Sequence, residues 1–245
     1  EEYKTIDIPT YLDWSSDKGF ARAVEMCNGQ GICRKLNEEI MCPSYMATRD
    51  ERDTTRARAN ALRAVLSGRL KREELTSKDI YNIFELCILC KGCKKECPSR
   101  VDVAKMKIEF LAHYNRAHGI STRDYIFGHI HKISQIASYA PRLFNVIKET
   151  AFSKHILSTL GIHPNRSLPY VAKPTFTEWF YKTRSKKTLD ERKEVVYFHD
   201  TWTTFYYPEI GRATVELLEA AGFRVIIVPK RACCGRPLLS KGMVE

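Results

Sequence analysis

The cysteines between positions 87 and 97 have the spacing of an iron–sulfur ligand set. The run reads Cys87-x-x-Cys90-x-x-Cys93-x-x-x-Cys97-Pro98. Three thiolates at this spacing can each bind one corner of a cubane cluster, and a fourth cysteine ahead of a proline is typical of bacterial ferredoxins. Zinc sites usually pair two separated C-x-x-C arms instead. We therefore predict a cluster here, in preference to zinc or to cysteines that are merely buried.

The proline after Cys97 predicts the conformation of that cysteine. Proline disfavours the helical region for the residue before it, so Cys97 should be extended and should point away from its three neighbours. In two-cluster ferredoxins the cysteine at this place binds the other cluster. The run therefore predicts a second group of ligands elsewhere in the sequence.

An altered copy of the run lies upstream. It reads Cys27-Asn28-Gly29-Gln30-Gly31-Ile32-Cys33 and is followed by Cys42-Pro43. Gln30 occupies the place of the second cysteine, and eight residues rather than three separate Cys33 from Cys42. The two glycines leave room for the backbone to approach a cofactor.

Exchange of the fourth cysteines between the runs gives two ligand sets. The complete set is Cys42, Cys87, Cys90 and Cys93. The other set has three thiolates, from Cys27, Cys33 and Cys97. Three thiolates suit a [3Fe-4S] cluster, or a [4Fe-4S] cluster with an open or non-cysteine corner. Two alternatives remain: a single cluster with Cys27 and Cys33 as ordinary residues, or clusters that serve only to stabilise the fold.

Arginines follow the first Cys-Pro pair, and two of them are candidate cofactor contacts. Arg56 and Arg58 lie in the segment TTRARANALR, whose composition predicts a helix. Their guanidinium groups could donate hydrogen bonds to cluster sulfurs, which would raise the reduction potential. The alternative is a solvent-facing helix that contains arginine for its helix propensity.

A third cysteine motif, Cys233-Cys234-Gly235, follows a predicted strand. Residues 194–199 and 224–228 read as strands and residues 208–221 as the helix between them, which predicts a parallel β–α–β unit. Ligands of open α/β sheets bind at the carboxyl ends of strands. Cys233 and Cys234, with Asp200 at the end of the preceding strand, are therefore candidate catalytic residues; ordinary buried thiols are the alternative.

Helical segments must position the two cysteine runs. We predict helices over residues 20–26, 54–66, 79–89 and 101–118, and a further helical region from 121 to about 160 that Pro141 interrupts. Residues 1–19 read as an extended lead-in, and the charged stretch 182–193 reads as a linker or an exposed turn.

Composition limits the classes of function. The chain has 245 residues and a net charge of +11. Clustered cysteines favour metal binding over disulfides, and metal-binding thiols fit a reducing compartment. We therefore expect a cytoplasmic location or the inner face of a membrane. The charge fits a solvated surface, compensation of anionic clusters, or an acidic or lipid partner. Nucleic acid is a weaker candidate for the partner, because aromatic and basic residues are not interleaved as in single-strand binders.

Several other kinds of site lack their sequence signals. The sequence contains no G-x-G-x-x-G after a strand, no P-loop and no serine nucleophile elbow. It also contains no signal peptide and no apolar run of membrane-spanning length. Because the chain starts at Glu1 and stops directly after a motif, we interpret it as a piece of a longer polypeptide.

The order of these motifs resembles a known family. C-x5-C, CPSYMATRDERDTTRARANALR, CxxCxxCxxxCP and CCG occur in sequence. From about Trp14 to Met243 the chain resembles the iron–sulfur portion of FAD-linked oxidases of the D-2-hydroxyacid dehydrogenase type, including D-lactate and D-2-hydroxyglutarate dehydrogenases. It is also similar to the iron–sulfur subunits of glycolate oxidase, anaerobic glycerol-3-phosphate dehydrogenase and heterodisulfide reductase.

The resemblance implies a mainly α fold. It implies a two-cluster alpha-helical ferredoxin domain over residues 20–120, a helical connector and linker over 121–193, and the first half of an α/β cysteine-rich (CCG) domain over 194–245. The seven cysteines of the two runs would be the cluster ligands.

The resemblance also implies a function. FAD on an upstream domain or a partner subunit would oxidise a hydroxyacid, and the clusters would pass single electrons to a quinone, a cytochrome or another carrier protein. Peripheral contact with the inner membrane face would fit such an acceptor.

Two departures from the family pattern leave alternatives. Asp200 stands where the fullest cysteine-rich motif has a cysteine, and Gln30 replaces a ligand of an ordinary second four-iron cluster. One competing hypothesis is thiol or disulfide chemistry at Cys233 and Cys234, similar to that of heterodisulfide reductase. Another is a basic module with structural clusters that binds nucleic acid or membrane.

Overall fold

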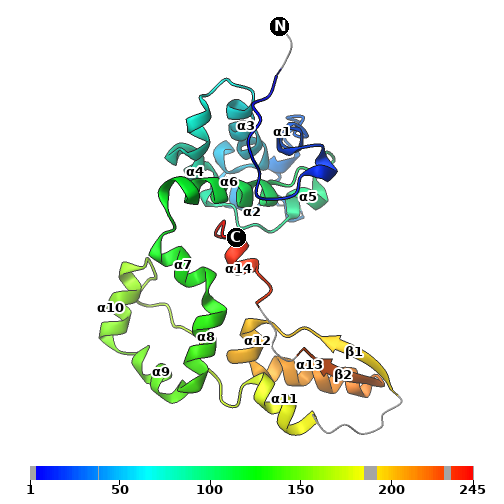
Figure 1. Ribbon diagram of the computed structural model, residues 1–245, viewed down its shortest axis with the longest axis vertical. Helices are drawn as coiled ribbons and strands as arrows, with labels where there is room; N and C mark the ends of the chain where they lie inside the picture. The colour runs from blue at the N-terminus through cyan, green and yellow to red at the C-terminus, as the bar shows by residue number, and fades with distance from the viewer. Residues whose placement is uncertain (1–3, 38, 185–191, 229–232, 245) are drawn as a thin grey trace. The chain divides into compact units, whose positions relative to one another are not determined.

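The computed structural model describes residues 4–37, 39–184, 192–228 and 233–244. The chain divides into two compact units, one formed by Glu1–Ser121 with Leu238–Glu245 and the other by Thr122–Pro237 (Figure 1). Helices dominate both units, which confirms the predicted mainly α fold class. The domain boundaries within that prediction remain predictions.

The first unit is built from helices joined by short turns. Its α-helices are α1 (Phe20–Glu25), α2 (Pro43–Thr48), α3 (Thr55–Leu66), α4 (Lys78–Glu85), α5 (Gly92–Glu96) and α6 (Val103–His118). Single 3-10 turns occupy Ser15–Asp17, Ile32–Arg34, Glu51–Asp53 and Arg72–Thr76. The predicted helices over 20–26, 54–66 and 101–118 are confirmed to within two residues.

Side-chain caps fix where the two long helices begin. The Thr54 hydroxyl accepts a hydrogen bond from the Ala57 amide at the start of α3, and Asp102 accepts one from the Lys105 amide at the start of α6. Gly119, with a φ of 80°, follows the last residue of α6. Both caps agree with the starts of these helices that composition and pattern predicted.

Helix α4 ends four residues earlier than predicted, at Glu85. Leu86 is its C-cap, and Leu89 has a φ of 58°, which a helix cannot accommodate. The predicted continuation to Leu89 is therefore wrong: residues 87–89 belong to the loop that carries the cysteines.

The core of the first unit lies between α1, α3, α4 and α6. The Phe84 and Phe110 rings stack with centroids 5.0 Å apart, and Leu62 is fully buried in the same cluster. The extended lead-in joins this core through Trp14, whose indole Nε1 donates to Glu109 Oε2 over 2.9 Å. The cysteine loops therefore rest on a well-packed helical base.

The second unit contains helices and a small parallel sheet. The helices are α7 (Thr122–Gly128), α8 (Ile130–Tyr139), α9 (Pro141–Ile147), α10 (Ala151–Thr159), α11 (Phe176–Arg184), α12 (Thr201–Phe205) and α13 (Pro208–Ala220), and α14 (Arg236–Leu239) lies at the boundary of the unit. As predicted, Pro141 interrupts the region from 121 to 160, where it begins α9. Most of the predicted charged linker 182–193 lies outside the described residues.

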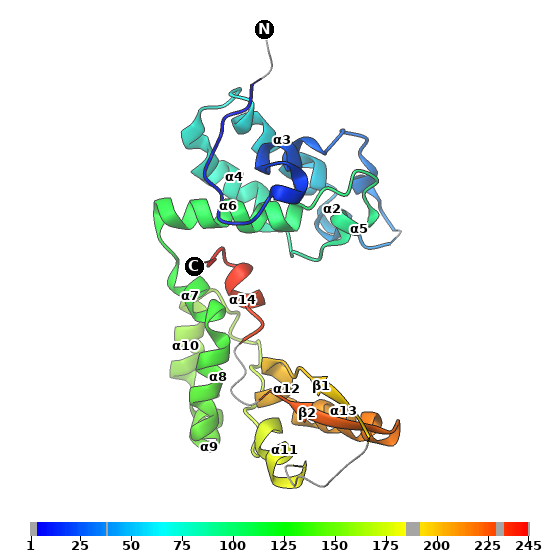
Figure 2. The same cartoon turned by 45° about the vertical axis from the view of Figure 1, so that its right-hand side comes forward.

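The predicted β–α–β unit is confirmed. Strands β1 (Lys193–Tyr197) and β2 (Phe223–Ile227) pair in parallel with Val195 opposite Val225, and α13 lies along them (Figure 2). Strand β1 is more exposed than the predicted buried strand, with Val196 58% exposed. Among the described residues only one face of the sheet packs against the apolar cluster around Phe176, so alternate residues of β1 face outward.

Candidate iron–sulfur centres

Four cysteines from the two runs line one pocket in the first unit. They are Cys42, Cys87, Cys90 and Cys93, the complete ligand set predicted by exchange of the fourth cysteines. None of the nine cysteines of the chain forms a disulfide. The structure thus brings these four residues together, while their binding of iron remains a prediction.

The N-terminus of α6 faces this pocket. Val103 and Ala104 line it, and their backbone amides donate hydrogen bonds to the Cys93 sulfur. Burial nevertheless raises the pKa of the Cys93 thiol to about 11, because the amides offset only part of the desolvation. The positive end of a long helix is a favourable place for an anionic ligand.

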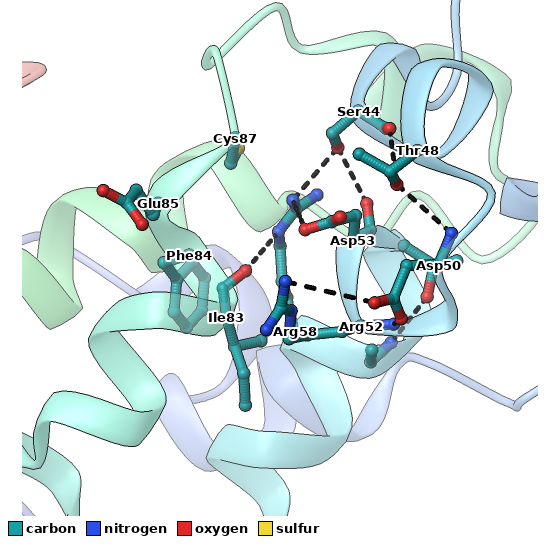
Figure 3. A network of polar contacts seen from close by, with 12 residues as sticks. Ser44, Thr48, Asp50, Arg52, Asp53, Arg58, Ile83, Phe84, Glu85 and Cys87 are labelled. Carbon is teal, nitrogen blue, oxygen red and sulfur yellow. Dashed lines mark hydrogen bonds and ion pairs between the residues drawn. The ribbon is translucent and has the colours of Figure 1, made fainter.

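A buried arginine also lines the pocket. Arg58 is fully buried, and its Nη1 lies 3.5 Å from Cys42 Sγ. Its Nε donates to the Ile83 carbonyl over 3.0 Å and its Nη2 to Ser44 Oγ over 3.0 Å (Figure 3). The predicted role of Arg58 at the cofactor therefore has a geometric basis, and the alternative of a solvent-facing Arg58 is wrong.

Asp53 is the counter-ion of Arg58. Its Oδ1 lies 3.7 Å from Arg58 Nη2, and both residues are almost completely buried. Neither carboxylate oxygen has a hydrogen-bond partner in the described part of the chain. The ion pair is therefore held by charge and by the surrounding backbone, not by a saturated network.

These groups change the acidity of Cys42. Burial raises the pKa of its thiol, but the hydrogen bond with Ser44 and the Arg58 charge lower it more, so the net pKa lies below its ordinary value. Thiolates are the form of cysteine that binds metal. Cys42 is thus already biased toward the ligand form.

Lys107 supports the loop that begins at Cys87. Its buried ammonium donates to the carbonyls of Phe84 and Cys87, each over 2.7 Å, and to that of Glu85 over 3.3 Å. Burial lowers the pKa of Lys107 to about 8. The side chain satisfies carbonyls left open where α4 stops, and it places a cation behind the cysteine loop.

The predicted three-thiolate set is only partly assembled by the described contacts. Cys27 and Cys33 are both buried against the same core. Burial raises the pKa of the Cys33 thiol above its ordinary value, because hydrogen bonds from the Arg56 amide and Thr54 offset only part of the desolvation. Cys97 is extended, with φ −72° and ψ 126°, as the following proline predicts. Its approach to Cys27 and Cys33 remains a prediction.

Arg56 contacts the first loop rather than a thiol. Its Nη1 donates to the Gly29 carbonyl over 3.1 Å, and its Nε donates to Glu51 Oε1 over 2.8 Å. Arg56 therefore shapes the loop between Cys27 and Cys33, and a direct contact between its side chain and a cofactor remains a prediction.

The predicted third site lies in the second unit. Cys233 is half-buried and Cys234 is exposed. The Asp200 carboxylate caps α12 by accepting a hydrogen bond from the Thr203 amide over 2.7 Å. This structural use accounts for an aspartate at that position, and a catalytic role for the three residues remains a prediction.

Two other kinds of feature are absent from the described residues. No three His, Cys, Asp or Glu side chains in the described ranges converge as the ligands of a single metal ion do. In the same ranges, no helix has the length and apolar character needed to cross a bilayer.

Ser44 and Lys107 were not predicted as parts of the site. Ser44 follows the Cys-Pro pair, so its closeness to Cys42 was available from the sequence as a local signal. Lys107 lies twenty residues after Cys87, on another helix, and its sequence context is that of an ordinary amphipathic helix. Only the tertiary fold identifies it.

Comparison with known proteins supports the chemistry of the site. Residues 26–102 match the family described as the 4Fe-4S dicluster domain, a range that contains both cysteine runs. Four cysteines that line one pocket, a helix N-terminus and a buried cation fit a thiolate-ligated anionic cluster, which is larger than a single metal ion. No solved structure matches the chain.

The relatives include oxidoreductases and iron–sulfur subunits of oxidoreductases. The chain is 22% identical to D-2-hydroxyglutarate dehydrogenase of Pseudomonas putida, over 97% of this chain and 27% of that protein. It is 26% identical to one subunit of the anaerobic glycerol-3-phosphate dehydrogenase of Escherichia coli, over 51% of this chain and 32% of the relative.

A third relative is the probable glycolate oxidase iron-sulfur subunit of Bacillus subtilis, 25% identical over 79% of this chain and 46% of the relative. The chain spans about a quarter of the length of the D-2-hydroxyglutarate dehydrogenases it matches. These matches confirm the resemblance found from the cysteine motifs.

Proposed function

We propose that the chain relays single electrons through two iron–sulfur clusters, from an FAD-dependent dehydrogenase site of the D-2-hydroxyacid type to a quinone, a cytochrome or another carrier. The observation that carries the proposal is the pocket shared by Cys42 and the three cysteines of the second run. Residues so far apart in sequence meet there with a helix N-terminus and a buried guanidinium. When bound, a cluster supplies reversible one-electron transfer.

The two proposed ligand sets differ in their number of cysteines. Cys42, Cys87, Cys90 and Cys93 would hold a [4Fe-4S] cluster, and Cys27, Cys33 and Cys97 would hold a second cluster, either [4Fe-4S] or [3Fe-4S]. Exchange of Cys42 and Cys97 between the runs would place the two centres close to each other. The dehydrogenase relatives support a flavin partner, on another domain or another subunit.

The first experiment asks whether the clusters exist. The chain is purified anaerobically, and iron, acid-labile sulfide and zinc are measured together with the paramagnetic resonance spectrum. We expect a brown protein with about seven or eight irons per chain and two reducible centres. A colourless protein that contains zinc would refute the proposal.

The second experiment asks whether they relay electrons. Photoreduced FAD is mixed anaerobically with the loaded chain, and a soluble quinone is then added in excess. Bleaching of the cluster absorbance by the flavin and its return with the quinone are expected. Loaded clusters that neither reagent changes would contradict a relay while leaving the metal content established.

A further inference from the structure

The two cysteine loops have left-handed residues at the same positions. Residues two and four positions after the first cysteine are left-handed in both, although the sequences differ. These residues are Gly29 (φ 79°) and Gly31 (φ 78°) in the first loop, and Leu89 (φ 58°) and Lys91 (φ 64°) in the second. Left-handed non-glycine residues are uncommon, so Leu89 and Lys91 adopt this conformation because the loop requires it.

Backbone hydrogen bonds repeat at the same positions. In each loop the first cysteine donates to the carbonyl three residues before it, and the residue after the last cysteine does the same. The bonds are Cys27 N to Val24 O (3.4 Å), Cys87 N to Phe84 O (3.0 Å), Arg34 N to Gly31 O (2.9 Å) and Lys94 N to Lys91 O (3.0 Å). The loops therefore enter and leave in the same way.

A basic side chain from the following long helix supports each loop. Arg63 of α3 donates to the carbonyls of Glu25 and Cys27, as Lys107 of α6 donates to those of Glu85 and Cys87. The last cysteine of each loop also meets the N-terminus of that helix: Cys33 accepts from the Arg56 amide, and Cys93 from the Val103 and Ala104 amides. The first loop is thus built as a cluster loop.

This equivalence gives Gln30 a defined place. Cys27 corresponds to Cys87, Cys33 to Cys93, and Gln30 to Cys90, and both Gln30 and Cys90 are exposed. A glutamine amide is a neutral oxygen donor, which is a poor substitute for the soft anionic thiolate that cluster iron prefers. The second ligand of the loop is therefore missing at a position where its side chain faces solvent.

We infer that the centre bound by Cys27, Cys33 and Cys97 is a four-iron cluster in which the iron beside Gln30 has no protein ligand and faces solvent. This inference rests on the proposed function. It identifies one exchangeable coordination position, occupied by water or hydroxide and open to a small soft anion such as a free thiolate. It also gives this iron a route of loss that the four-thiolate centre lacks.

The test is oxidation of the anaerobically loaded chain with ferricyanide. In the open-corner centre one electron passes to ferricyanide, a [4Fe-4S]²⁺ core becomes [3Fe-4S]⁺, and one iron(II) ion leaves. We expect one iron per chain to be released, detected with a chelator, and the three-iron paramagnetic signal to appear.

Variants of the first loop test whether Gln30 occupies the position that corresponds to Cys90. Gln30→Cys should suppress iron release and the three-iron signal at least tenfold, because it restores the missing thiolate. Asn28→Cys adds an exposed thiol to the same loop at the wrong position and should behave like wild type. Gln30→Ala should also behave like wild type, since no bond from Gln30 to iron is proposed.

The outcomes separate this inference from the proposed function. Two clusters that both resist ferricyanide, or release that Gln30→Cys does not change, would overturn the open corner and leave the relay standing. A three-iron centre in the freshly loaded, reduced protein would also overturn it. Loading of only one cluster, at the four-cysteine pocket, would instead refute the two-cluster proposal itself.

Discussion

Replacement of Arg58 should lower the reduction potential of the cluster at the four-cysteine pocket. Its guanidinium is fully buried and lies 3.5 Å from Cys42 Sγ. A positive charge stabilises the reduced cluster, which carries one more negative charge than the oxidised cluster. Arg58→Gln removes the charge and keeps a hydrogen-bonding side chain.

The size of the shift follows from Coulomb's law. A charge about 6 Å from the added electron contributes roughly 3 kcal/mol at an effective dielectric constant of about 20. Asp53 lies 3.7 Å from the guanidinium and opposes this effect. If Asp53 cancels about half, roughly 1.4 kcal/mol remains, which equals about 59 mV for one electron.

The assay is a redox titration monitored by paramagnetic resonance on the loaded chain. Arg58→Gln should lower the potential of one centre by roughly 60 mV, and Arg58→Lys should lower it less because the charge is kept. Arg52→Gln is the matched control: it removes an equal charge from an exposed residue that contacts only Asp50 in the described network. That variant should change neither potential by a measurable amount.

Asp53→Asn decides between an electrostatic and a purely structural role. Removal of the opposing carboxylate should raise the potential, the opposite sign to Arg58→Gln. Breaking a buried ion pair destabilises the fold, so the double variant Asp53→Asn/Arg58→Gln provides a folded reference without an unpaired buried charge. Shifts of the same sign in both single variants would refute the electrostatic reasoning.

Three further predictions concern the two units. Cys42→Ser should leave the four-cysteine centre with three thiolates and make it lose one iron to ferricyanide, seen as a second three-iron paramagnetic signal after anaerobic loading. Glu109→Gln should cost about 1.5–3 kcal/mol in urea unfolding, because the carboxylate accepts a hydrogen bond from Trp14. Burial raises the pKa of Glu109, but the hydrogen bonds to its carboxylate lower it more, so the pKa is lower in the folded state than in the unfolded state. The stabilisation should therefore be complete at a pH above the unfolded-state pKa, and it should be lost as the pH falls through the folded-state pKa. Gly211→Ala should lower the thermal midpoint of the second unit, because a Cβ would lie 2.5 Å from the Phe176 ring.

The placement of four cysteines around one pocket was predictable because its signals are local. Spacing and the Cys-Pro pairs predicted which four thiols would meet, and the structure places Cys42 with Cys87, Cys90 and Cys93. The extended conformation of Cys97 followed from its neighbour alone. Long helices with clear caps, such as α3 and α6, were predictable for the same reason.

What the sequence did not predict depends on contacts between distant residues. The apolar pattern of α4 continues to Leu89, but the cysteine loop needs a left-handed residue there, so the loop overrides the helix pattern. Lys107 reads as one lysine among many until the fold buries it against the end of α4. Exposure of β1 likewise depends on what covers the sheet, which its own residues do not state.

The net charge of +11 had three interpretations: a solvated surface, compensation of anionic clusters, and an acidic or lipid partner. The position of each cation distinguishes the first two. Arg52 and Lys94 are exposed, where solvent screens their charge, so they influence a cluster weakly. Arg58 and Lys107 are buried against Cys42 and Cys87, where the same charge acts at short range in a medium of low dielectric constant. Burial of a cation without a nearby anion is unfavourable. Of these two buried cations, only Arg58 has a carboxylate partner among the described ion pairs. An anionic cluster in the pocket would therefore supply the negative charge that Lys107 lacks, and the charge of Lys107 would in turn raise the reduction potential of that cluster.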